Sequence, residues 1–205
     1  MLKSLLISLL FVTLFNLYMI KSGYTRRKDF SRQHFLFGYL MILYLIISLT
    51  EVVGFPSIYQ WNRSLIQYGT IFHPEISLVP FSESMDISMI LNIILFMPLG
   101  FLLPALWRKY NGVIPTLFTG FIFSLVIEIS QLFVNYRATD VNDLIMNTLG
   151  TLAGWLLYRI LKKPFHKIAS KIRVCNRPED SILIKAEPLI YLVTAMAGCF
   201  LGQRI

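Results

Sequence analysis

Charged residues are scarce in this chain of 205 residues. Only 15% are Asp, Glu, Lys or Arg and 56% are hydrophobic, whereas an ordinary soluble domain has roughly 25% and 45–50%. The hydrophobic residues come in runs too long for the core of a soluble protein of this size to bury. The composition therefore excludes a soluble enzyme and predicts an all-α fold, a polytopic transmembrane helical bundle.

Cysteine and histidine are also rare, with two and three copies. Cys175 lies in a basic stretch and Cys199 in an apolar run, so no disulfide is expected between them. The chain lacks the HExxH and GxSxG patterns of known hydrolases, and His34, His73 and His166 are scattered over predicted loops. These residues predict neither a metal site nor a cofactor. The basic residues are not interleaved with stacking aromatics, which argues against nucleic acid as a partner.

Five apolar stretches with few charged residues are long enough to cross a hydrocarbon core of about 30 Å, which takes roughly 20 helical residues. The first is interpreted as a retained helix, because no small-residue cleavage site follows it as after a signal peptide. A sixth stretch, residues 188–201, is short enough to fit a re-entrant segment as well as a span. The bundle is thus predicted to have five to six spans, at residues 4–20, 35–53, 87–107, 113–136, 141–160 and, less regularly, 188–201.

The basic residues predict the orientation of the bundle. Of the 19 Lys and Arg, fifteen fall in the first, third and fifth loops, and the other four are Lys3, Arg63, Arg137 and Arg204. Short loops rich in Lys and Arg stay in the cytoplasm, so these three loops are predicted to be cytoplasmic and the amino terminus exterior. The cytoplasmic basic cluster around residues 162–173 is expected to bind the headgroups of anionic membrane lipids.

The most informative residues are polar ones that the membrane disfavours. Glu128 lies inside the fourth predicted span, where a carboxylate costs on the order of 2.5–3.5 kcal/mol. Eight residues separate it from Tyr136, which predicts a depth of roughly 12 Å below the outer surface. Polar residues of the third, fourth and fifth spans are expected to converge there as a ligand-binding set: Asn92, Glu128, Gln131, Arg137, Asp140, Asp143 and Asn147.

Each of these residues also has a purely structural explanation. Asn92 and Asn147 can serve as interhelical hydrogen bonds, typically worth about 0.6 kcal/mol in membrane bundles. Arg137 can pair with Asp140, and Asp143 is favoured by the helix dipole if a helix begins near Asp140. A buried carboxyl with an arginine and two aspartates nearby nevertheless indicates an intramembrane functional site.

The long second loop and the glycines add to the expected architecture. Aromatic and apolar residues in the loop predict an exterior amphipathic helix lying on the membrane. The segment at residues 78–81 is expected either to fold over the polar site or to be an ordinary connector. Gly150 and Gly154 form a small-residue face, and Gly100 after Pro98 lets a neighbouring helix approach closely.

Four motifs, in this order, resemble the VanZ-like family of bacterial integral membrane proteins: Leu78-Val-Pro-Phe, Asn92-Ile-Ile-Leu-Phe-Met-Pro-Leu-Gly, Glu128-Ile-Ser-Gln-Leu and Arg137-Ala-Thr-Asp-Val-Asn-Asp-Leu-Ile-Met-Asn-Thr-Leu-Gly. The resemblance divides the chain into a first span with its basic loop (1–34), a VanZ-like core (35–161) and a basic loop with a final apolar segment (162–205). The namesake of the family is linked to low-level resistance to the glycopeptide teicoplanin. The resemblance therefore implies a role at the cell envelope, in the plasma membrane of a bacterium.

Two classes of function are compatible with these residues. The first is a binding protein whose outer-leaflet cavity holds a lipid, a lipid-linked cell-wall precursor or an amphiphilic antibiotic such as a lipoglycopeptide, with Arg137 engaging an anionic group. The second is an intramembrane hydrolase or transferase, in which Glu128 with Asp140 or Asp143 supplies acid-base or metal-assisted chemistry. A small proton-coupled transporter using Glu128 is a further alternative, although no clear inverted repeat is present.

Overall fold

The computed structural model describes residues 1–21, 31–81, 87–164, 171–174 and 182–202. Several residues discussed above lie outside this part of the chain: Cys175, His166 and the basic residues at positions 26–28, 167, 177 and 204.

Six helical segments within the described residues are long and apolar enough to cross a membrane, so the predicted all-α bundle is confirmed. Their helices are α1 (Leu2–Lys21), α2 (Arg32–Ile47), α4 (Ile87–Leu106), α5 (Val113–Gln131), α6 (Val141–Leu161) and α8 (Ile182–Leu201). The π-helical turn η2 (Ser48–Val53) extends α2, and the 3-10 turn η3 (Arg108–Asn111) follows α4. The second loop contains α3 (Ile58–Tyr68) and the short strand β1 (Ile76–Ser77), which pairs with β2 (Thr139–Asp140).

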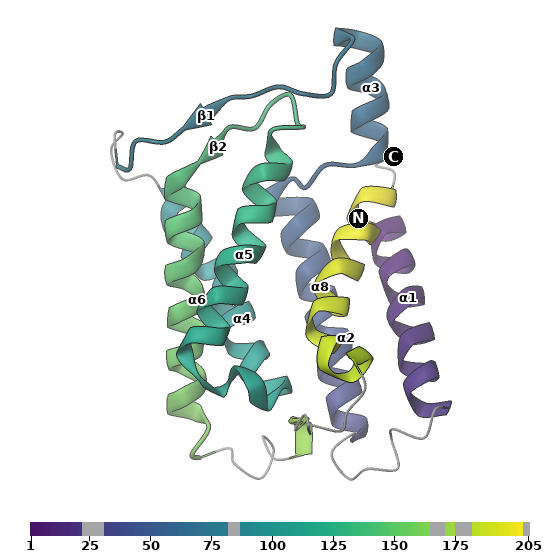
Figure 1. Ribbon diagram of the computed structural model, residues 1–205, viewed down its shortest axis with the longest axis vertical. Helices are drawn as coiled ribbons and strands as arrows, with labels where there is room; N and C mark the ends of the chain where they lie inside the picture. The colour runs from purple at the N-terminus through teal and green to yellow at the C-terminus, as the bar shows by residue number, and fades with distance from the viewer. Residues whose placement is uncertain (22–30, 82–86, 165–170, 175–181, 203–205) are drawn as a thin grey trace.

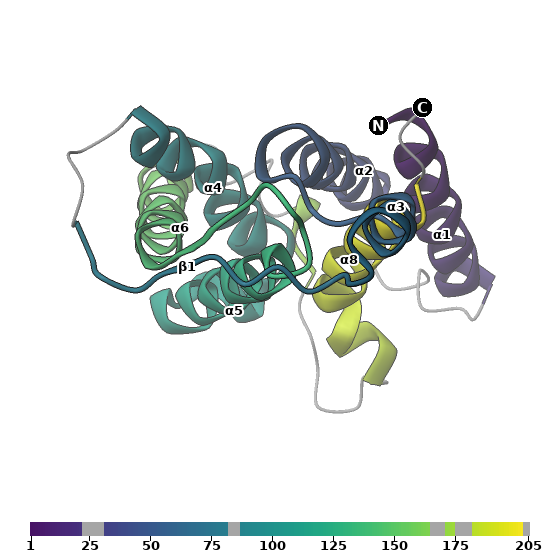
Figure 2. The ribbon, with the colours of Figure 1, turned by 90° about the horizontal axis from the view of Figure 1, so that it is seen from above.

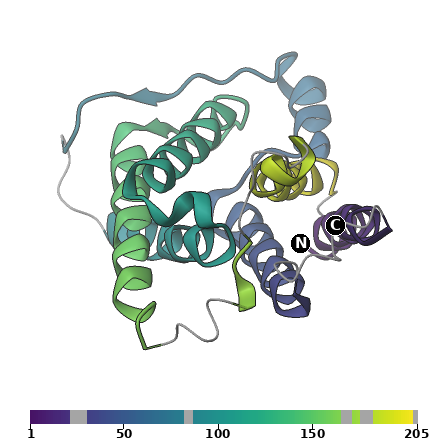
Figure 3. The ribbon, with the colours of Figure 1, turned by 60° about the horizontal axis from the view of Figure 1, so that its bottom comes forward.

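The spanning helices run alternately up and down, so both ends of the chain lie at the same end of the bundle (Figure 1). This end also carries α3 and the two strands; we call it the strand end (Figure 1). Seen from above, α4, α5 and α6 form one group and α1, α2 and α8 another (Figure 2). The view in Figure 3 shows the same division, and α2 joins the groups by packing against α4.

The closest helix packing is between α4 and α6. A Cβ atom built on Gly100 would lie 2.0 Å from the carbonyl oxygen of Thr151, and one on Gly154 would lie 2.0 Å from that of Met97. Such distances are far below van der Waals contact, so only glycine fits at these positions. The close approach predicted from Gly100, Gly150 and Gly154 is therefore confirmed.

The last helix is longer than the 14 uncharged residues of its sequence suggested. Helix α8 has 20 residues and begins at Ile182, so it includes Glu187, which is fully buried. The Glu187 carboxyl is accommodated because His34 Nε2 lies 2.9 Å from its Oε1 and Trp107 Nε1 donates to its Oε2 at 2.7 Å. With 20 residues the helix is long enough to span, which favours a span over the re-entrant alternative, because a paired carboxyl does not force the helix to begin after it.

The contact between Glu187 and His34 ties α8 to α2. The ring of His34 is held on both sides, with Nδ1 2.8 Å from the carbonyl oxygen of Ile172 and Nε2 2.9 Å from Glu187 Oε1. Trp107, which follows α4, donates to the other oxygen of the same carboxyl, so the contact also joins α8 to the end of α4.

A basic residue lies next to this pair. Lys109, in η3, donates from Nζ to the carbonyl oxygen of Lys185 at 2.8 Å. Partial burial lowers the pKa of Lys109, and the negative charge of Glu187 opposes this effect. This contact adds a second link between α8 and the chain that follows α4.

Helix α3 is amphipathic, as expected, but it does not lie across the bundle. It stands roughly along the bundle axis above α8, and Figure 2 views it end-on. The first turn of α3 is fixed because Trp61 packs against Phe133 and Phe200, with ring centroids 5.8 and 4.8 Å away. These tertiary contacts override the tendency of its apolar face to lie flat on a bilayer.

Replacing Glu187 by alanine tests the role of the buried pair. The change leaves His34 and the Trp107 N–H without their carboxylate, so the free energy of unfolding should fall by about 3–5 kcal/mol. Equilibrium unfolding in mixed detergent micelles measures this loss. Ile182→Ala is the matched control, since Ile182 is in the same helix and is 83% exposed. Equal stability of the two variants would contradict the anchoring role of Glu187.

Candidate functional site

The predicted polar residues gather at the strand end of the bundle. Helix α5 ends at Gln131, not near residue 136, because the next residues form 3-10-type turns: the Leu132 N–H donates to the Ile129 carbonyl and the Val134 N–H to that of Gln131. Glu128 therefore lies about one turn from the end of its helix. The expected helix end near Tyr136 was wrong, so the depth of roughly 12 Å calculated from it no longer follows.

Glu128 is 3% exposed and has several partners at the start of α6. Its Oε2 accepts the backbone N–H of Asp140 at 3.0 Å. With its amide nitrogen turned toward the acceptors, Gln131 donates to the same oxygen at 3.2 Å and to the carbonyl of Ala138 at 3.0 Å. The hydroxyl of Thr139 donates to the backbone carbonyl of Glu128 at 2.9 Å. The end of α5 and the start of α6 are thus joined through one buried carboxyl.

The two aspartates lie at the amino-terminal end of α6. Asp140 is the N-cap residue, and its Oδ1 accepts the backbone N–H of Asn142 at 2.8 Å. Asp143 is in the first turn, as expected if the helix begins near Asp140. The positive end of the helix dipole stabilises both negative charges. These residues therefore have a structural role in addition to any contact with a ligand.

The two asparagines belong to different helix contacts. Asn92 Nδ2 donates to Asp143 Oδ1 at 2.6 Å, which joins α4 to the cluster. Asn147 lies one turn deeper and donates to the hydroxyl of Ser124 at 2.9 Å. The Oδ1 atom of Asn147 is buried without a hydrogen-bond partner in the part of the chain that the structure describes. Asn92 thus bonds directly to Asp143, whereas Asn147 bonds to a serine of α5.

Arg137 reaches back to the end of η2. Its Nη2 donates to the carbonyl oxygen of Val52 at 3.0 Å, and its guanidinium group lies against Gly54, the C-cap residue of η2. The pairing with Asp140 that the sequence offered as an alternative is not formed among the described residues. A cation is well placed here because the last carbonyls of a helix carry partial negative charge.

The strand pair holds the second loop beside this cluster. Ile76 pairs with Thr139 and Ser77 with Asp140, in parallel register. Further along, the backbone N–H of Phe81 donates to Asn142 Oδ1 at 2.9 Å. Phe81 has a φ of 55°, a conformation that is strained for a bulky residue and is often found near functional sites. The segment at residues 78–81 therefore lies beside the start of α6. This position is compatible with the expectation that the segment folds over the polar site.

The cluster combines three carboxyl groups with one guanidinium group. The charges of Asp140, Asp143 and Arg137 all act on Glu128, so these four groups lie within electrostatic range of one another. Glu128 is buried, whereas the other three are partly exposed. We call Asn92, Glu128, Gln131, Arg137, Asp140 and Asp143 the acidic cluster. It offers hydrogen-bond acceptors to a ligand, with one fixed cation beside them.

No group of three or more His, Cys, Asp or Glu side chains is placed to hold a metal ion within the described ranges. The carboxyl groups of the acidic cluster instead make hydrogen bonds to Asn92, to Gln131 and to backbone N–H groups. In these bonds the carboxyl oxygens are the acceptors.

The buried contact between His34, Trp107 and Glu187 was not predicted from the sequence. His34 was assigned to a loop, but it is fully buried in the first turns of α2. The available signal was Glu187 itself, a carboxylate immediately before an apolar run. Its partner His34 lies 153 residues away along the chain, so spacing alone gave no indication of the pair.

The bundle and its intramembrane polar cluster define a multi-pass membrane protein. The sequence profile of the VanZ/LLP1 family matches residues 35–162, and the chain belongs to this family. Protein VanZ of Enterococcus faecium is 29% identical to it over 125 residues, which cover 60% of this chain and 74% of that protein. No solved structure matches the chain significantly. The matched region contains the whole acidic cluster and excludes α1 and α8.

Two glycines allow the contact of Arg137 with η2 to be tested separately from backbone strain. Gly54 and Gly69 both have a φ of 69°, so alanine at either position should cost about 1–2 kcal/mol. A Cβ atom on Gly54 would also lie 3.0 Å from Nε and Nη2 of Arg137, whereas nothing lies within 4 Å of one on Gly69. Gly54→Ala should therefore lose about 1 kcal/mol more than Gly69→Ala, because it disturbs a charge-assisted hydrogen bond. Unfolding in detergent measures both, and equal losses would contradict the contact.

Proposed function

We propose that this protein binds the polar headgroup of an amphiphile at the acidic cluster: a lipid, a lipid-linked cell-wall precursor or an amphiphilic antibiotic. The observation that best supports this proposal is a buried carboxyl group at one end of a membrane bundle. It belongs to Glu128 and lies within electrostatic range of Asp140, Asp143 and Arg137. Ionisable groups in such positions are costly and usually functional.

The chemistry of the cluster favours a ligand rich in hydrogen-bond donors. Three carboxyl groups accept from hydroxyl, amide or ammonium groups, and low local polarity strengthens each such bond. Arg137 uses one N–H on Val52 and has further N–H groups in its planar fork for an anionic substituent. A headgroup carrying hydroxyls or amines together with one acidic group matches this set.

Exposed apolar residues beside the cluster supply a surface for the apolar part of the ligand. Leu78, Val79 and Phe81 are 72%, 64% and 48% exposed, although they follow directly on β1. Their segment is held against the start of α6 through Asn142. Exposed apolar residues next to a polar site are typical of interaction surfaces for lipids and other amphiphiles.

The distribution of basic residues supports an exterior position for this ligand. The described residues Lys21, Arg32, Lys109 and Lys162 lie at or beyond helix ends opposite the strand end. The positive-inside rule predicts that this end is cytoplasmic, and the proposal therefore takes the acidic cluster to face the exterior. The link between the namesake of the family and teicoplanin resistance also supports an exterior amphiphile.

Binding measurements with Glu128→Gln test the proposal. The purified protein in lipid nanodiscs is titrated with a lipid-linked cell-wall precursor and, separately, with teicoplanin. Removing the carboxylate should weaken binding of at least one of them about tenfold or more. Glu51→Gln is the matched control, because Glu51 is an exposed carboxyl in η2. The affinity of this variant for each ligand should stay within about twofold of that of the unchanged protein.

The same samples distinguish binding from catalysis. Recovered ligands should be chemically unchanged after prolonged incubation. Turnover that Glu128→Gln abolishes would identify an enzyme and overturn the binding proposal. Undiminished affinity of Glu128→Gln for both ligands would show that Glu128 is only a helix contact.

A further inference from the structure

A pocket lies outside the acidic cluster, between α3 and residues 133–136 that follow α5. It has a volume of about 520 Å³, within the range of small-molecule sites. Its lining includes Tyr59, Tyr68 and Tyr136, two glutamines and Arg63. We call it the α3 pocket. No residue of the acidic cluster lines it.

The lining chemistry of the α3 pocket suits a saccharide. Tyrosine rings offer apolar faces with a hydroxyl at the rim, which match the apolar C–H faces and hydroxyl edge of a sugar ring. The amide of Gln67 provides two donors and an acceptor, so it can bond to hydroxyl groups in either direction. None of the lining residues carries a carboxyl group, and Arg63 forms no ion pair with any residue that the structure describes.

The pocket is held open by contacts on both of its sides. Gln60 closes the capping box of α3 with Ser57, and its amide also donates to the hydroxyl of Tyr136. Near the other end of the helix, Ser64 donates to the carbonyl of Thr70 at 2.7 Å and lies 2.7 Å from His73 Nε2. A preformed site of this kind loses little conformational entropy when a ligand binds.

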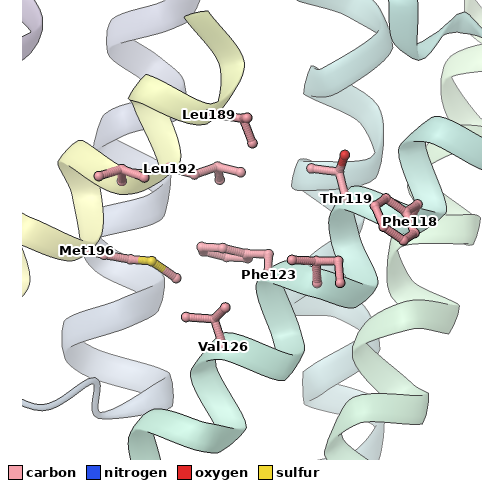
Figure 4. Close-up of a pocket in the computed structure, with 9 residues that line it drawn as sticks. Phe118, Thr119, Phe123, Val126, Leu189, Leu192 and Met196 are labelled. Carbon is pink, nitrogen blue, oxygen red and sulfur yellow. The ribbon is translucent and has the colours of Figure 1, made fainter. Parts of the chain in front are cut away.

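An apolar groove lies below the α3 pocket, between α5 and α8. Figure 4 shows Phe123 and Val126 of α5 facing Leu192 and Met196 of α8 across this groove. Its volume is about 180 Å³, and its lining is almost entirely apolar. Both helices are candidate membrane spans, so the groove opens toward hydrocarbon.

Three aromatic rings connect the groove to the pocket. Phe200 follows Met196 by one turn of α8, and Phe133 follows Val126 toward the strand end. Trp61 of α3 packs on both rings, at 4.8 and 5.8 Å. The apolar groove, the three aromatic rings and the polar α3 pocket thus follow one another along the bundle axis.

We infer that this series of sites binds a glycolipid, with its saccharide in the α3 pocket and an acyl chain in the groove between α5 and α8. A single ligand that occupies both sites must be amphiphilic, because the groove is apolar and the α3 pocket is polar. The inference does not rest on the acidic cluster, since the two sites share no residue. One wall of the groove, α8, lies outside the region that matches the VanZ/LLP1 family.

The saccharide contact is tested with diglucosyl-diacylglycerol as the probe and the full chain in nanodiscs. Native mass spectrometry compares its retention with that of diacylglycerol and phosphatidylglycerol of the same acyl chains. Tyr59→Ala combined with Gln67→Ala should reduce retention of the glycolipid about tenfold and leave phosphatidylglycerol unchanged. Ile66→Ala with Asn62→Ala is the matched control, because both residues are exposed positions on α3 that do not line the pocket.

The acyl contact is tested by filling the groove. Val193 lines it and is 62% exposed, so Val193→Trp should reduce glycolipid retention. The same variant should leave binding of the water-soluble disaccharide maltose unchanged, as measured by saturation-transfer NMR. Ile182→Trp, at an exposed position of α8 outside the groove, is the control.

Three outcomes would overturn the inference. Unchanged glycolipid retention in the Tyr59 and Gln67 variant would show that the pocket does not bind the saccharide. Equal retention of phosphatidylglycerol would show that Arg63 attracts any anionic lipid. Unchanged glycolipid retention in Val193→Trp would show that the acyl chain does not occupy the groove. Melting temperatures of all variants, compared with their controls, separate loss of binding from loss of folding.

Discussion

A carboxyl group inside hydrocarbon requires partners from the protein itself, and the two ends of this bundle are organised by that requirement. At the strand end, Glu128 accepts the backbone N–H of Asp140 and joins α5 to α6. At the opposite end, Glu187 accepts from Trp107 and pairs with His34, which fixes α8. The contacts differ in kind: the first leaves partly exposed charges around it, whereas all three residues of the second are fully buried. The first therefore has the features of a site, and the second those of an anchor.

The family region and its flanking helices have separate roles in this arrangement. Helices α4, α5 and α6 pack closely through glycines and carry the acidic cluster, and all three lie within residues 35–162. Helices α1 and α8 lie beyond that region and pack mainly on each other and on α2. The groove between α5 and α8 is formed where the two groups meet without packing tightly (Figure 4). A ligand at this boundary would contact both the family core and a helix that lies outside the matched region.

Much of the fold was predictable because membrane helices are encoded locally, by runs of apolar residues long enough to span. The acidic cluster was predictable for the opposite reason, since a carboxylate such as Glu128 stands out within such a run. The errors arose where distant residues decide the outcome. Helix α8 begins early only because His34 and Trp107 pair with Glu187, and α5 ends early where its chain turns back to pair with β1. The α3 pocket was not predictable because it depends on how α3 docks against residues after α5.

Whether the acidic cluster faces the exterior is tested most directly by cysteine labelling in intact cells. In a Cys175→Ser background, in which the remaining Cys199 is buried, single cysteines are introduced at Tyr136, which is 64% exposed at the strand end, and at Lys163, which is exposed beyond α6. A membrane-impermeant maleimide should label Tyr136→Cys in intact cells and Lys163→Cys only after permeabilisation. The reverse pattern would place the cluster in the cytoplasmic leaflet and contradict the binding of an exterior amphiphile.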